Sequence, residues 1–253
     1  MKHYQNLPIE NLSIENLSRD KLSEGIDELL AETYFLNTQH PQVRAFTEAA
    51  LGLPLDRAQL MPETERAIKL FYAVRDQVRY DPYRISLADR DYQAHEVLNC
   101  GYGWCISKAA LLATVLRAAH IPSAIGLADV VNHLTTDKLR ERMGGVTTFY
   151  NHGYVALKLN QQWFKAVPAF NIELCERFGV KPTEFDGRSN ALYQEYDQSN
   201  RLHMEYQADH GTWSDLPMAK IRDELRANYP GSAMIREIDE AALGRFEEDA
   251  PLK

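Results

Sequence analysis

A single cysteine, Cys105, stands where a long apolar helix is expected to begin. From Cys105 to Ala119 nearly every residue is apolar, which predicts a helix enclosed on almost all sides. The unpaired backbone N–H groups and the positive dipole end at a helix start favour a thiolate over a thiol. Residues 101–104, with two glycines, allow a tight turn that exposes the sulfur. Cys105 is therefore a candidate nucleophile.

His152 stands at the head of a predicted half-buried strand that runs from Gly153 to Leu159. From this position an imidazole can accept the thiol proton and stabilise the resulting ion pair. Each residue alone also has a simpler interpretation. A lone cysteine in an apolar helix is usually inert packing, and a lone histidine at a strand start usually has no chemical role.

The surrounding elements must bring the two residues together. A helix is predicted from about Pro62, with acidic residues in its first turn, and it ends before Pro82. The cysteine helix is followed by a strand at 124–131, a long loop at 132–150 and the histidine strand. A hairpin turn at 160–162 then leads into a strand at 163–167. A further helix is expected near residues 26–33.

Composition limits the class of protein. A chain of 253 residues suits one domain, or one domain with an appendage. The net charge of -8 excludes a general nucleic-acid binder. Three cysteines cannot form a disulfide framework and suggest a reducing compartment. The start of the chain lacks the apolar run of a secretion signal, and no apolar stretch is long enough for a membrane span. We therefore expect a soluble, cytoplasmic protein without membrane partners, although an oligomer is possible.

The chain is expected to divide into three parts. Residues 1–24 form an N-terminal extension, within which residues 9–13 repeat as 14–18. Two copies of five residues are too short for a solenoid. Residues 25–236 form a single domain, and the acidic residues 237–253 form a C-terminal tail.

Four segments share their order and spacing with a known family. Residues 103–122 contain GWC, then small and aliphatic residues, LRA and IP; residues 151–155 read NHGYV; residues 163–169 read WFKAVPA. Together with the helix at 71–81, they resemble the transglutaminase-like superfamily over about residues 64–171. The resemblance implies an α+β fold with a papain-like core, in which the cysteine lies on a buried helix packed against an antiparallel sheet that bears the histidine. It implies Cys105 as nucleophile, His152 as general base, and no metal or cofactor.

The third member of the expected catalytic group departs from the family pattern. Members usually carry an aspartate on the strand after the histidine, where this sequence has Lys165 or Val167. Asn171 is the nearest substitute, because an amide oxygen can accept the histidine N–H. Asp186 is a more distant alternative that keeps the negative charge. The backbone N–H of Cys105 is a natural oxyanion donor, and Trp104 either donates its indole N–H or forms a wall of the cleft.

Two Cys/His patterns suggest metal sites but match no zinc signature: His203, Glu205, Asp209 and His210 in one segment, and His95 with Cys100 and Cys105 in the other. We predict no metal. Cys100 could form a disulfide with Cys105 under oxidation.

The sequence therefore predicts a cysteine hydrolase or acyltransferase that acts on an amide or ester bond of a peptide, protein or small substrate. Hydrolysis is the default outcome. The alternative is a non-catalytic peptide-binding or scaffold module that retains the fold, because the aspartate is missing. We also expect at least two of eight C-terminal residues to border the cleft of Cys105; these are Phe185, Asp186, Tyr193, Tyr196, His203, Tyr206, His210 and Trp213.

Overall fold

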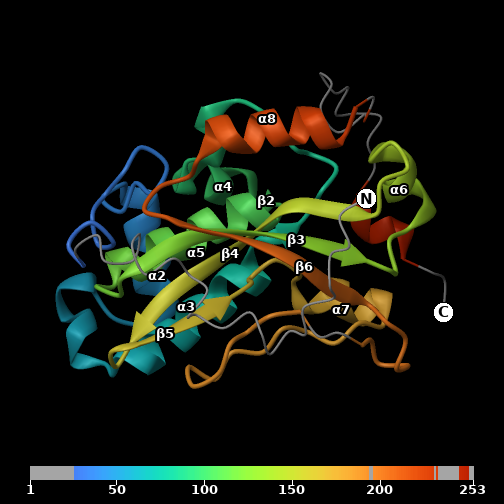
Figure 1. The fold of residues 1–253 in the computed structure, drawn as a ribbon. Helices are drawn as coiled ribbons and strands as arrows, with labels where there is room; N and C mark the ends of the chain where they lie inside the picture. The colour runs from blue at the N-terminus through green and yellow to red at the C-terminus, as the bar shows by residue number, and fades with distance from the viewer. Residues whose placement is uncertain (1–25, 194–195, 231, 233–244, 251–253) are drawn as a thin grey trace.

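A four-stranded antiparallel sheet forms the centre of the computed structural model, which describes residues 26–193, 196–230, 232 and 245–250 (Figure 1). The strands are β3 (Ser123–Asn132), β4 (Thr148–Leu159), β5 (Gln162–Ala166) and β6 (Met204–Trp213), and their order in the sheet is β5-β4-β3-β6. A separate short parallel pair joins β1 (Arg79–Tyr80) to β2 (Tyr102–Gly103). The predicted N-terminal extension, its repeat and most of the predicted acidic tail lie outside the described residues.

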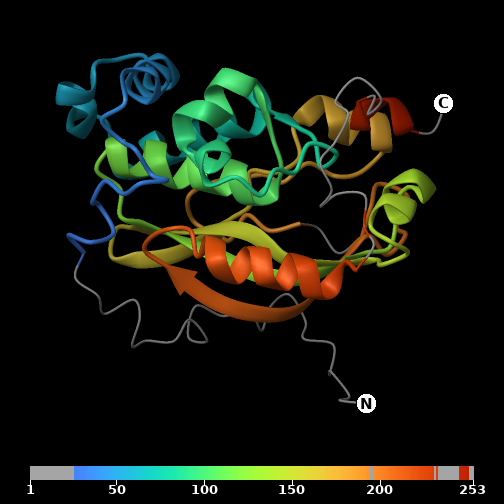
Figure 2. The same ribbon diagram turned by 90° about the horizontal axis from the view of Figure 1, so that it is seen from above.

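Helices cover one face of the sheet (Figure 2). They are α2 (Pro41–Leu51), α3 (Glu63–Gln77), α4 (Ala94–Cys100) and α5 (Cys105–Ala118), with 3-10 turns at Leu55–Leu60 and Asp89–Tyr92. Residues 105–117 of α5 are all buried, as the apolar run predicts. The core therefore lies between α5 and the sheet, and the predicted α+β fold is confirmed.

In the described residues the C-terminal part adds strand β6 and three helical elements: α7 (Ile172–Phe178), α8 (Met218–Asn228) and a 3-10 turn at Phe246–Asp249. The end of α8 is fixed to β4 through Tyr229, whose hydroxyl accepts a hydrogen bond from the Tyr150 N–H at 2.8 Å and donates to the Thr148 carbonyl at 2.9 Å. Strand β6 pairs with β3 in antiparallel register. The C-terminal part therefore extends the sheet and encloses one end of it.

Several sequence predictions hold and two need correction. The hairpin turn between β4 and β5 is present, with Asn160 and Gln161 at φ 49° and 67°, the left-handed pair of a tight hairpin turn. The predicted loop at 132–150 instead contains α6 (Asp137–Arg142) and the first residues of β4. The Thr136 hydroxyl caps α6 by accepting from the Leu139 N–H, and Leu139 is buried. Residues 26–31 form turns with i to i+3 hydrogen bonds rather than a helix.

No helix in the described part of the chain has both the length and the apolar character that crossing a bilayer requires.

Candidate active site

Cys105 is the first residue of α5, and the turn before it is closely packed. The Trp104 N–H donates to the Ser107 hydroxyl at 3.0 Å, which caps the helix start. A Cβ atom on Gly103 would lie 2.6 Å from the Ser107 oxygen, so only glycine leaves room for this cap. The glycines expected to expose the sulfur therefore serve to seat the helix, and Cys105 is only 2% exposed.

His152 lies on β4, next to the closest contact between the sheet and α5. A Cβ atom on Gly153 would lie 2.8 Å from the Ile106 Cα and 3.0 Å from the Cys105 carbonyl oxygen. The strand backbone therefore touches the helix backbone at the start of α5. The Gly153 N–H in turn donates a hydrogen bond to the Cys105 sulfur. This packing brings the two predicted catalytic residues to the same end of the core.

The two nitrogens of His152 differ in their contacts. The Nε2 atom lies 3.2 Å from the Tyr193 hydroxyl oxygen, and the two rings meet edge to face with centroids 5.0 Å apart. The Nδ1 atom is buried and has no hydrogen-bond partner among the described residues. No hydrogen bond therefore joins the imidazole to the Cys105 sulfur in this structure.

Burial controls the charge of both groups. It raises the pKa of the Cys105 thiol to about 12, even though the N–H groups of Gly153, Ile106 and Cys105 itself act in the opposite direction. Burial also lowers the pKa of His152 to about 3. The sequence-based expectation that a helix start favours the thiolate is therefore wrong for this closed state, because desolvation outweighs the helix terminus. The thiol of Cys105 and the imidazole of His152 are therefore both neutral near pH 7.

Cys105 borders a narrow apolar pocket of about 20 Å³, which has room for about one water molecule. Its walls include Tyr80 and Trp104 on one side and Leu225 and Tyr229 from the α8 end on the other. The Trp104 indole N–H bonds the Tyr92 hydroxyl, so its ring is held as a wall. The eight C-terminal residues expected at this cleft do not line it, because the end of α8 occupies that place.

The two residues predicted to orient the histidine have other partners. The Asn171 side-chain oxygen accepts from the Tyr80 N–H at 3.1 Å. Asp186 is exposed and accepts from the N–H groups of Arg188 and Ser189, which hold a turn and lower the pKa of its carboxyl. Neither prediction anticipated Tyr193, which holds the Nε2 position.

The course of the chain after β5 explains how Tyr193 reaches His152. The segment that contains Ala191 runs parallel to the end of β5: the Ala191 N–H donates to the Lys165 carbonyl, and the Val167 N–H donates to the Ala191 carbonyl. Val167, one of the two residues that can align with the missing aspartate, is fully buried. Lys165 points elsewhere, to Asp209 at 2.5 Å. The Tyr193 side chain, from the segment beside β5, thus contacts His152. Strand β5 itself supplies no side chain that does so among the described contacts.

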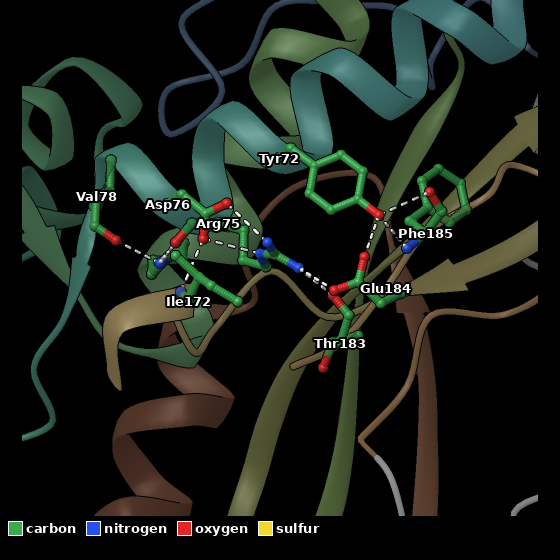
Figure 3. Close-up of polar contacts among 9 residues, drawn as sticks. Tyr72, Arg75, Asp76, Val78, Ile172, Thr183, Glu184 and Phe185 are labelled. Atoms are coloured by element: carbon green, nitrogen blue, oxygen red, sulfur yellow. Dashed lines mark hydrogen bonds and ion pairs between the residues drawn. The ribbon is translucent and has the colours of Figure 1, made fainter. Parts of the chain in front are cut away.

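An ionic network around the buried Arg75 guanidinium fixes this segment to α3 (Figure 3). The Arg75 guanidinium pairs with Asp76 at 2.8 Å and with Glu184 at 3.1 Å, and it donates to the Thr183 carbonyl at 2.8 Å. Asp76 also accepts from the Ile172 N–H at 2.9 Å, at the start of α7. The network therefore anchors both ends of the stretch between α7 and the turn that precedes Tyr193.

Lys108 completes the same network from inside α5. Its ammonium group donates to the Arg75 and Val78 carbonyls at the end of α3, and burial lowers its pKa to about 7. The cysteine helix and the segment that carries Tyr193 are thus both tied to the end of α3.

The other predicted groups lie apart. Among the described residues no cluster of three or more His, Cys, Asp or Glu side chains could hold a metal ion. His210 lies 2.8 Å from Asp129, whereas Glu205 lies 3.0 Å from His133. The His95 ring stacks on His40 with centroids 4.0 Å apart, and no disulfide joins any of the three cysteines.

A buried helix with cysteine at its start, packed on an antiparallel sheet that bears a histidine, is the fold of cysteine-dependent acyl-transfer enzymes. Residues 54–168 match the family model of the transglutaminase-like superfamily, in agreement with the resemblance found in the sequence. The match begins ahead of the predicted core at residue 64. No curated protein matches the chain closely enough to count as a relative.

Among solved structures, the chain is similar to the arylamine N-acetyltransferase from Mycobacterium abscessus. The alignment has 18% sequence identity and a TM-score of 0.37, and it covers 60% of this chain and 48% of that protein. The chain thus spans about half the length of that protein, and the likeness is too distant to indicate a substrate.

Proposed function

We propose that this protein is a cysteine-dependent acyl-transfer enzyme in which Cys105 is the nucleophile and His152 the general base. The observation that carries the proposal is the contact of Gly153 with the start of α5, which sets the cysteine and histidine at one end of the core. The match of residues 54–168 to the transglutaminase-like superfamily supports the same assignment.

Nδ1 of His152 is the nitrogen available for proton transfer, because Nε2 contacts the Tyr193 hydroxyl. In the proposed reaction the Cys105 sulfur attacks the carbonyl carbon of an amide or ester while its proton passes to Nδ1. The imidazolium then returns that proton to the leaving amine or alcohol, and an acyl-enzyme remains. Attack by water, activated by the same nitrogen, releases a carboxylic acid and restores the thiol.

The two neutral groups set a condition on this mechanism. Because the pKa of Cys105 is high and that of His152 is low, a preformed ion pair is disfavoured in the closed state. Proton transfer therefore accompanies attack on the substrate. The backbone N–H groups that now contact the sulfur, including that of Cys105, are the donors available to the developing oxyanion.

Asn171 keeps an indirect role in this proposal. Its oxygen holds the Tyr80 N–H, and Tyr80 forms a wall of the pocket of Cys105. Asn171 is thus a positioning residue for the pocket, and Tyr193 takes the place of the orienting side chain.

We also propose an acyl acceptor, an acyl donor and a cytoplasmic location for the protein. We take water as the default acceptor and a peptide, protein or small amide or ester as the donor. Cysteines that form no disulfide suit the reducing cytoplasm.

Trapping of the acyl-enzyme tests the proposal. Intact-mass spectrometry after mixing with p-nitrophenyl acetate should detect one acetyl group, and peptide mapping should place it on Cys105. Cys105→Ala should lose this adduct, whereas Cys175→Ala, the matched buried control, should retain it. Acetylation that is unchanged in Cys105→Ala would contradict the assignment.

A second candidate function, a non-catalytic binding module, is favoured by one observation. The aspartate position is occupied by Lys165 or Val167, both buried, and the pocket of Cys105 has room for only about one water molecule. If the protein is a binding module, no member of a panel of activated esters and amides should give an acyl adduct. The wild type and Cys105→Ala should then bind a peptide equally well. If the protein is an enzyme, the acyl adduct should form on the wild type and be absent in Cys105→Ala.

A further inference from the structure

A second cavity, larger than the pocket of Cys105, lies beside α7. Its volume is about 260 Å³. Its walls are mainly apolar and include Leu134, Phe170, Leu174, Phe178 and Phe246. Neither Cys105 nor His152 lines it. A dry apolar cavity of about 150 Å³ can hold benzene, so this one has room for a substituted ring.

The buried polar side chains of the lining are Asn132, Thr135 and His203; those of Asn132 and Thr135 have hydrogen-bond partners. His203 borders the cavity, is 3% exposed, and has no hydrogen-bond partner for its Nδ1 atom among the described residues. Burial lowers its pKa to about 4, so the imidazole is neutral near neutral pH. A buried polar atom without a partner is destabilising, and a ligand that supplies a suitable hydrogen bond would remove that cost.

The charges around the cavity are already matched. Arg201 also borders it, but its guanidinium binds the Asp197 carboxylate at 2.8 and 2.7 Å. No free cation therefore faces the apolar walls within the lining described here. A buried anion without a partner would be costly, so an uncharged ligand fits this lining better than a carboxylate.

We propose that this cavity binds a small uncharged molecule with an aromatic or branched aliphatic body and one hydroxyl or amide group that pairs with Nδ1 of His203. This site is additional to the proposed acyl-transfer site. A chain of side-chain contacts links the two sites: the Phe170 ring packs on Tyr193 with centroids 4.8 Å apart, and the Tyr193 hydroxyl contacts His152. A ligand in the cavity packs against Phe170, which in turn packs on the residue that holds the histidine.

Binding of three probes to the full chain tests the proposal. Benzyl alcohol and benzamide carry an uncharged polar group on a ring, and benzoate carries a charge. Saturation-transfer NMR and calorimetric titration should show that the first two bind, with benzoate at least about tenfold weaker. The His203 ring nitrogens should shift in a ¹H–¹⁵N long-range spectrum of the wild-type protein on titration with benzamide.

Variants locate the bound probe. Leu174→Trp places a large ring in the cavity and should abolish binding, whereas Leu60→Trp, at a surface position that is 83% exposed, should not. His203→Phe keeps a ring but removes the hydrogen bond, and should weaken binding about two- to tenfold. Cys105→Ala should bind as the wild type does, which separates this site from the proposed catalytic one.

The proposal is overturned if no probe binds up to its solubility limit, or if benzoate binds as tightly as benzamide. It is also overturned if Leu174→Trp binds normally, or if the His203 signals do not move. Should Leu174→Trp fail to fold, the His203 shift in the wild type still decides. If the probes bind as expected but p-nitrophenyl acetate gives no acyl-enzyme, the proposed acyl-transfer activity is wrong and the proposed binding site stands.

Discussion

The Cys105 thiol combines a reactive position with an unreactive environment. It begins a helix and accepts backbone hydrogen bonds, yet apolar walls raise its pKa to about 12. Cys100 is exposed on the preceding helix and serves as an internal reference. The contrast between these two thiols gives the first prediction.

Iodoacetamide should modify Cys100 before Cys105 near neutral pH, because only the thiolate reacts and Cys105 holds its proton. As the pH is raised, the alkylation rate at Cys105 should increase about tenfold for each pH unit, as long as the pH stays below the pKa of the thiol. Peptide mapping by mass spectrometry after timed exposure measures both rates. Faster modification of Cys105 than of Cys100 at neutral pH would contradict the closed, neutral site.

Tyr193 supports the histidine in place of an acid. Tyr193→Phe removes the hydroxyl at His152 Nε2 and keeps the ring packing, so acyl-enzyme formation should slow about tenfold, the value of one hydrogen bond of about 1.4 kcal/mol. Tyr196→Phe, three residues along and 41% exposed, is the matched control and should keep the wild-type rate. Stopped-flow kinetics with p-nitrophenyl acetate measures both; equal rates in the two variants would remove Tyr193 from the site.

Helix α5 and strand β4 approach each other more closely than side chains would permit. Gly153→Ala forces a methyl group against the Ile106 Cα and the Cys105 carbonyl, so the free energy of unfolding should fall by about 3 kcal/mol. Gly52→Ala meets no atom within 4 Å and carries only the strain of its φ of 75°, for a loss of about 1 kcal/mol. Urea denaturation compares the two. A loss in Gly153→Ala no larger than in the control would show that the contact can relax freely.

The end of α8 covers the pocket of Cys105 with Leu225. Leu225→Ala removes part of this wall, and the rate of alkylation at Cys105 relative to Cys100 should rise about tenfold as water and reagent enter. Ile221→Ala is the matched control on the same helix, because Ile221 is fully buried but does not line the pocket. An equal increase in both variants would indicate general loosening of α8 rather than a local opening.

The elements differ in how far the sequence predicts them. The apolar run after Cys105 and the turn at Asn160 and Gln161 have strong local patterns, and both elements are present. Helix α6 has only six residues, and its Thr136 cap lies in a charged stretch without helical periodicity. Tyr193 lies in a segment whose path is fixed by Ala191 beside β5, a contact distant in sequence that no local pattern encodes.

For the molecule as a whole, two buried neutral histidines link stability to pH. The pKa values of His152 and His203 are about 3 and about 4 in the folded protein, below the ordinary 6.5. As pH falls below about 6.5, the unfolded chain takes up protons at these residues and the folded chain does not, so stability falls. His210, whose pKa is raised beside Asp129, contributes in the opposite direction.

Between about pH 7 and about pH 5, each of the two histidines should remove about 2 kcal/mol from the free energy of unfolding. Urea denaturation at several pH values measures this loss. His203→Phe should reduce it by about half, because only His152 then takes up a proton on unfolding. A pH dependence identical to that of the wild type would show that His203 is not held neutral in the folded protein.

Strand β6 has a consequence for the order in which the protein matures. It pairs with β3 although α6, β4, β5 and α7 lie between them in the sequence. Pairings this distant form late, because the chain must first close a long loop. During synthesis Cys105 and His152 leave the ribosome well before Tyr193, β6 and α8. The thiol of the nascent chain therefore lacks the cover of α8, and it stays accessible to oxidants until the last third of the protein is made.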